Sequence, residues 1–132
     1  MTLLWFSKAE QDLITAKALL DLTSEHFESI VFHCQQAVEK SLKGYLVFNK
    51  SRFQKTHDIA KLIEAIALLN LDLAKKYDQA SELTKYAIAY RYPEEIEQVK
   101  TLTRQNVSDV YQLSKNLYSD FKKEIKIGST NV

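Results

Sequence analysis

Apolar side chains recur every three or four residues along most of the chain, which is the spacing of an amphipathic helix. The pattern predicts four long helices and one short one, over roughly residues 7–22, 26–49, 58–69, 72–90 and 101–126. Consecutive helices of this kind, joined by short connections, pack side by side around a common core. We therefore expect an all-α fold, an up-and-down helical bundle.

Residues with strong positional preferences suggest where the first helix begins. Ser7 and Glu10 have the spacing of a capping box, in which each side chain accepts a hydrogen bond from the other residue's free backbone N–H. Trp5 and Phe6 precede this pair and are expected to pack back onto the helix. The first helix should therefore open at Ser7.

Later boundaries follow from similar signals. Thr56 or Asp58 is expected to cap the third helix, and Asp72 to open the fourth. Pro93 should end the fourth helix, because the residue before a proline disfavours the helical conformation. An acidic connection over residues 92–100 leads to the last helix, and the tail from Gly128 is expected to fray.

Composition supports a helical fold and limits the classes of function. The chain has 132 residues, with only two glycines and one proline, whereas sheets need turns that draw on both residues. This length fits one domain, predicted over residues 1–127, with 128–132 as a tail. The net charge of +1 excludes a global positive field that would drive nonspecific nucleic-acid binding, so any such contact needs a local patch.

The sequence predicts neither a metal site nor a cofactor. Cys34 is the only cysteine, and His26, His33 and His57 are far apart without a carboxylate at metal-ligand spacing. No glycine-rich phosphate loop is present. No signal sequence opens the chain and no apolar run is long enough to cross a membrane, so a cytoplasmic protein is expected.

The segment FHCQQAVEKSLKGYL, residues 32–46, carries the first candidate site. Placing side chains about 100° apart puts a polar stripe opposite the core stripe of this helix. The stripe contains His33, Gln36, Lys40 and Lys43. It could be a solvated face, a dimer interface or part of an anion pocket.

Two further clusters have both a structural and a functional interpretation. His57 stands between Thr56 and Asp58 at a helix start, which is either a plain capping cluster or an anion site. Arg91 stands between Tyr90 and Tyr92. It could simply interact with the helix dipole. It could instead hold a phosphate, while the two tyrosines stack on a base.

The order and spacing of several blocks resemble the HEPN domain family (higher eukaryotes and prokaryotes nucleotide-binding). The blocks are FHCQQAVEKSLK at 32–43, THDI at 56–59 followed by Leu62, and YRYP at 90–93, preceded by Trp5, Ala9, Asp12, Leu13 and Ala16. The resemblance covers nearly the whole chain and points to the small prokaryotic stand-alone members. It implies a helical bundle that forms a homodimer and a minimal nucleotidyltransferase as partner, in a toxin–antitoxin-like pair.

Many members of the wider superfamily are metal-independent endoribonucleases, whose motif is an arginine followed a few residues later by a histidine. Arg52 and His57 have this spacing, with the histidine as general acid or base and the arginine on the phosphate. The superfamily's motif typically lies in the second half of the bundle, however, and no histidine follows Arg91.

The sequence therefore favours a module that binds a nucleotide or RNA and is not itself an enzyme. The residues expected to contact the nucleotide or phosphate are Gln36, Lys40, Lys43, His57, Asp58, Tyr90, Arg91 and Tyr92. A ribonuclease toxin that uses Arg52 and His57 is the alternative, and a dimerisation bundle without a ligand is a third hypothesis.

Overall fold

The computed structural model describes residues 1–22, 25–53, 55–95 and 101–130, without the side chains of 93 and 126–130. These residues form six α-helices and two 3₁₀ helices, and no strand occurs among them. In chain order they are α1 (Thr2–Leu20), α2 (Phe27–Phe48), α3 (Ile59–Ala67), α4 (Leu71–Lys76), η1 (Asp78–Leu83), α5 (Thr84–Arg91), η2 (Pro93–Glu95) and α7 (Arg104–Thr130). The all-α prediction is confirmed.

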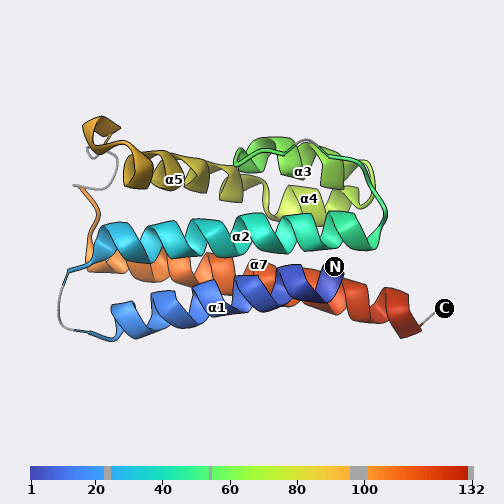
Figure 1. Cartoon of the computed structure of the whole chain (residues 1–132), viewed down its shortest axis with the longest axis horizontal. Helices are drawn as coiled ribbons and strands as arrows, with labels where there is room; N and C mark the ends of the chain where they lie inside the picture. Colours follow the sequence, from blue (N-terminus) through green and yellow to red (C-terminus); the bar gives the residue numbers. More distant parts are fainter. Residues whose placement is uncertain (23–24, 54, 96–100, 131–132) are drawn as a thin grey trace.

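Helix α2 lies at the centre of the bundle (Figure 1). It packs against α1 and α7 on one side and against α3 and α5 on the other. Helices α1 and α5 run in one direction, and α2 and α7 run in the opposite one (Figure 1). This is the up-and-down arrangement that was expected, and it leaves α2 little contact with solvent.

Burial along α2 shows the effect of this central position. Its buried residues fall on nearly every side of the helix, and Gln35, Glu39, Ser41 and Lys43 are buried among them. Gly44 allows α1 to approach closely, because a Cβ at this position would lie 2.8 Å from Cε2 of Phe6. In the polar stripe, Lys43 is buried and His33, Gln36 and Lys40 are partly buried, so the stripe is not a plain solvated face.

The predicted start of the first helix is wrong. Helix α1 begins at Thr2, and its N-cap is Met1 without a side-chain hydrogen bond, so Ser7 lies inside the helix and forms no capping box. The physical reason is the position of Phe6, which falls three residues before Ala9 in the buried stripe and is itself buried. Burying Phe6 in a longer helix stabilises the fold by more than a side-chain cap at Ser7 would.

The single helix predicted over 72–90 is divided into α4, η1 and α5. It also starts earlier, because the side chain of Asn70 accepts a hydrogen bond from the Leu73 N–H. Within the break, Tyr77, Ala80 and Leu83 are all buried. A 3₁₀ helix places residues i and i+3 in line, so η1 turns all three side chains toward the core.

The other boundaries are close to the predictions. Asp58 caps α3, and α5 ends at Arg91, two residues before the proline. Residues 96–100 of the acidic connection lie outside the described residues. Helix α7 ends at Thr130 and not near residue 126.

No helix in the described ranges combines the length and the apolar composition needed to cross a membrane.

Candidate functional site

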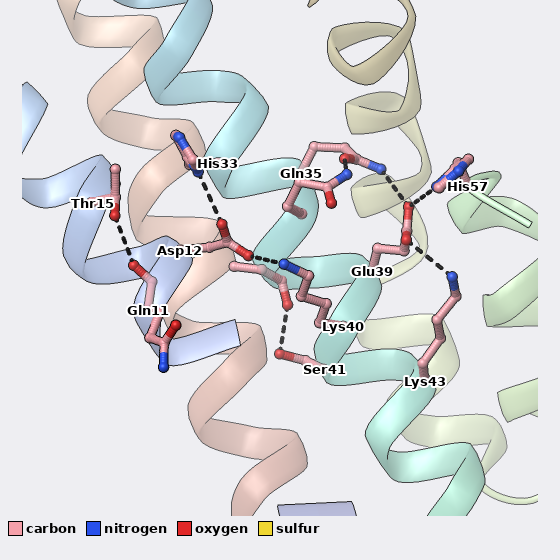
Figure 2. A network of polar contacts seen from close by, with 12 residues as sticks. Gln11, Asp12, Thr15, His33, Gln35, Glu39, Lys40, Ser41, Lys43 and His57 are labelled. Carbon is pink, nitrogen blue, oxygen red and sulfur yellow. Dashed lines mark hydrogen bonds and ion pairs between the residues drawn. The ribbon is translucent and has the colours of Figure 1, made fainter. Parts of the chain in front are cut away.

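Two buried carboxylates organise the polar stripe of α2 (Figure 2). Asp12 of α1 holds His33 and Lys40, and Glu39 of α2 itself holds Lys43 and His57. The two groups lie side by side along α2 (Figure 2). Four of the predicted site residues, His33, Lys40, Lys43 and His57, are therefore each held by a carboxylate.

The Asp12 cluster ties α1 to α2. The Asp12 side chain is only 12% exposed and lies on the buried face of its helix. Its Oδ2 accepts a hydrogen bond from Lys40 Nζ at 2.7 Å, and its Oδ1 lies 2.9 Å from His33 Nδ1. A buried carboxylate is stable only when it is paired and hydrogen-bonded, which this arrangement provides.

The Glu39 cluster ties α2 to the segment before α3. The Glu39 side chain is 4% exposed, and its Oε2 accepts from Lys43 Nζ at 3.0 Å. Its Oε1 accepts from Gln35 Nε2 at 3.2 Å and lies 3.0 Å from His57 Nδ1. Gln36 belongs to the same network, because its Nε2 donates to Gln35 Oε1 at 2.7 Å.

The imidazole of His57 is held at one edge and open at the other. Because a carboxylate only accepts hydrogen bonds, Nδ1 of His57 must carry a proton toward Glu39. The His57 side chain is 61% exposed, so Nε2 remains outside this contact. A histidine oriented in this way can present Nε2 to a ligand.

A pocket opens beside the Glu39 cluster. It has a volume of about 510 Å³ and is lined by Trp5, Lys43, Phe53, Lys55, Thr56 and His57. Its walls come from the start of α1, the middle of α2 and the segment between α2 and α3. Lysine, histidine and aromatic side chains are thus brought together from three distant parts of the sequence.

The neighbours of His57 are capping residues, as the structural interpretation predicted. The side chain of Asp58 accepts a hydrogen bond from the Ala60 N–H at 3.0 Å, and Thr56 Oγ1 accepts from the Asp58 N–H at 3.0 Å. Thr84 of α5 accepts from the Ile59 N–H at 3.0 Å. The carboxylate of Asp58 thus lies at the start of α3, where it complements the positive end of the helix dipole.

Arg91 and Tyr90 lie in a second group, around Phe32. The ring of Tyr90 stacks on that of Phe32 with centroids 3.9 Å apart, and the Arg91 guanidinium is 5.7 Å from the Phe32 centroid. Tyr92 is exposed beyond the end of α5. Eleven residues of helix separate Phe32 from Lys43, which is roughly 16 Å. One phosphate in the pocket therefore does not contact both groups.

Sequence reasoning missed the acids and the aromatic wall. Asp12 could have been found, because it is a charged residue within the apolar stripe of its helix. Glu39 stands four residues before Lys43, the spacing of a helical ion pair. Nothing in the local sequence places Trp5 or Phe53 near these residues.

Arg52, Cys34 and a possible metal site are the remaining points to consider. Arg52 is exposed in the segment that precedes His57. Burial raises the pKa of Cys34 to about 12, so this thiol stays protonated and unreactive. Within the part of the chain that the structure describes, no three His, Cys, Asp or Glu side chains are grouped to hold a metal ion.

Comparison with known proteins gives a family and one relative. The model of the HEPN domain matches residues 2–125. A protein of Methanocaldococcus jannaschii named "Putative toxin MJ1304" is 40% identical over 52 residues, which cover 39% of this chain and 33% of that protein. The match therefore spans a third of the relative's length. No solved structure matches. Because the family model covers nearly the whole chain, the protein belongs to the HEPN domain family.

Proposed function

We propose that the protein is a binding module for nucleotides or RNA, with the pocket beside Glu39 as its phosphate-binding site. The observation that supports this most directly is the lining of the pocket, which combines Lys43, Lys55 and His57 with two aromatic rings. Lysine ammonium groups donate hydrogen bonds that phosphate oxygens accept.

The electrostatics of the pocket favour an anion. Glu39 neutralises one positive charge, whereas Lys43 and Lys55 supply two. The Glu39 carboxylate is buried behind Lys43 and His57, so the cations face the pocket. Because the whole chain has a net charge of only +1, a phosphate site needs a local excess of positive charge such as this one.

The proposal extends to assembly and partner. Membership of the HEPN family supports a homodimer that works with a minimal nucleotidyltransferase. The name of the M. jannaschii relative supports a role in a toxin–antitoxin-like pair. In this proposal the Arg91 group around Phe32 contacts a neighbouring part of a longer RNA ligand, since it is too far from Lys43 to share one phosphate.

Isothermal titration with ATP, GTP and a short unpaired RNA tests the binding role. Lys55 is exposed in the pocket wall and makes no ion pair with a described residue, so Lys55→Ala should weaken binding several-fold without unfolding the protein. Lys115→Ala is the matched control, because Lys115 is an exposed lysine on α7, away from the pocket. Absence of binding to all three ligands, or equal loss in both variants, would contradict the proposal.

A metal-independent ribonuclease is the second candidate, and the Glu39–His57 contact favours it. A carboxylate that orients Nδ1 of a histidine leaves Nε2 placed for proton transfer. Arg52 would then hold the scissile phosphate. RNA incubated with the protein in the presence of a chelator should be cut by the wild type and not by His57→Ala. If both cleave alike, or if the wild type leaves RNA intact, the hypothesis of a ribonuclease that uses His57 is wrong.

A further inference from the structure

We propose that Trp5 is a base-stacking residue, so that the pocket selects a phosphate attached to an unpaired base over a bare phosphate or a duplex. This inference rests on the proposed function, because it assigns a ligand class to the same pocket. The pocket lining places the indole of Trp5 and the ring of Phe53 in the same cavity as Lys43, Lys55 and His57. Aromatic rings and cationic side chains in one pocket match the two chemical parts of a nucleotide, the base and the phosphate.

The position of Trp5 is fixed by the packing of α1 on α2. The residue is half-buried, while Leu3 and Leu4 beside it are exposed at 74% and 55%. Gly44 lets the backbone of α1 approach, and a Cβ at Gly44 would lie 3.0 Å from Cβ of Trp5. Phe6, the next residue, is buried against the same glycine. The indole is therefore anchored at its Cβ, while its ring stays half-buried in the pocket wall.

Lys43 joins the aromatic and the cationic parts of the pocket. Its Nζ lies 5.7 Å from the centroid of the Trp5 ring and 3.0 Å from Glu39 Oε2. The Lys43 side chain is only 10% exposed, so both contacts are made in a largely desolvated place. A ligand phosphate near Lys43 thus brings the attached base within reach of the indole.

The size of the pocket agrees with a single nucleotide. Its volume of about 510 Å³ lies within the roughly 300–1,000 Å³ of small-molecule sites. A base inside a duplex has both faces covered by its neighbours, so only an unpaired base can stack on a protein ring. The geometry points to free nucleotides or to single-stranded RNA.

The chain contains its own reporter for this contact, because Trp5 is its one tryptophan. We would titrate the protein with AMP, ribose 5-phosphate, inorganic phosphate, an unpaired tetra-adenylate and a blunt RNA duplex. Tryptophan emission and isothermal titration would be followed together. AMP and tetra-adenylate should quench the emission and bind roughly tenfold more tightly than ribose 5-phosphate, since stacking adds to the phosphate contact.

Two substitutions separate stacking from folding. Trp5→Leu should reduce the affinity for AMP to that for ribose 5-phosphate, while leaving the latter unchanged. Trp5→Phe keeps an aromatic ring and should retain part of the preference for AMP, which isothermal titration measures without the fluorophore. Circular dichroism shows whether each variant folds, and Trp5→Phe remains informative if Trp5→Leu does not.

The outcomes distinguish this inference from the proposed function. If AMP and ribose 5-phosphate bind equally and the emission does not change, the pocket binds phosphate and the stacking role is wrong. If the duplex binds as tightly as tetra-adenylate, selection for an unpaired base is also wrong. If no phosphate-containing ligand binds at all, both the stacking role and the binding module fail.

Discussion

Glu39 is the residue on which the candidate site most depends. Its buried carboxylate contacts Lys43 and Gln35 of α2 and His57 of the segment before α3. Without it, the Lys43 ammonium would be left buried and unpaired, and His57 would lose the contact that orients it. The Glu39 carboxylate therefore supports both the fold and the pocket.

We predict that Glu39→Ala lowers the free energy of unfolding by about 3 kcal/mol, because removing one partner of a buried ion pair leaves the other charge uncompensated. Urea denaturation followed by circular dichroism measures this change. Asp21→Ala is the matched control, since Lys17 and Asp21 also form an ion pair four residues apart but are 52% and 60% exposed. The control should change stability by less than about 1 kcal/mol. Equal effects of the two substitutions would show that the burial of Glu39 is unimportant.

The sequence pattern pointed to the basic residues of the site but not to the acids that pair with them. Lys40, Lys43 and His57 were predicted as site residues from sequence, and in the structure each contacts a carboxylate. Asp12, the partner of Lys40, and the wall residue Trp5 come from another helix, α1. Helical periodicity gives the face on which a residue lies, but it does not give the neighbour of that face. Contacts between helices therefore could not be predicted from the pattern.

Among the elements, the contact between α4 and α7 is the one whose strength we expect to depend on pH. Tyr77, the residue after α4, donates its hydroxyl hydrogen to Asp120 of α7, and Lys76 Nζ lies 2.7 Å from the same Oδ2. These two hydrogen bonds, Lys76 first, lower the pKa of Asp120 below its ordinary value of 3.8. Burial and the contact with Asp120 raise the pKa of Tyr77, so its hydroxyl stays protonated at neutral pH.

We predict that Asp120→Asn destabilises the protein by about 1 kcal/mol at pH 7, and that the difference from wild type shrinks at acid pH. The pKa of Asp120 is lower in the folded state than in the unfolded one. Its contribution is therefore complete above the unfolded value of 3.8 and disappears as the pH falls through the lower, folded value.

Thermal or urea unfolding at pH 7, 5 and 3 checks this dependence. Asp109→Asn on the same helix is the control, because Asp109 is exposed and accepts only from Gln105 among the hydrogen bonds of the described residues. A destabilisation by Asp120→Asn that is the same at every pH would refute the assignment.

Helix positions were predicted more reliably than helix starts and breaks. The signals at Asp58 and Pro93 were correct, because a cap or a proline acts within one turn. The capping box at Ser7 failed because burial of Phe6 outweighs a local cap. The break at η1 depends on contacts of Tyr77 with α7 and of Thr84 with α3, which lie far away in sequence.

For the whole molecule, we expect a dimer. One chain has a mass of 15.3 kDa, so multi-angle light scattering should give about twice this value. The basis is the family to which the chain belongs. A mass of one chain across the micromolar range would contradict this proposal, and it would leave the pocket beside Glu39 unaffected, because a single chain supplies its lining.

The pocket has a practical consequence that follows from its construction. Its six lining residues come from three stretches of sequence that only the folded chain brings together. A ligand that fits them therefore has no counterpart to bind in the unfolded chain, and it must shift the unfolding equilibrium by mass action. At a hundred times its dissociation constant, such a ligand adds about 2.7 kcal/mol to the free energy of unfolding. A thermal-shift survey of cellular metabolites could thus reveal a ligand before its chemical identity is known.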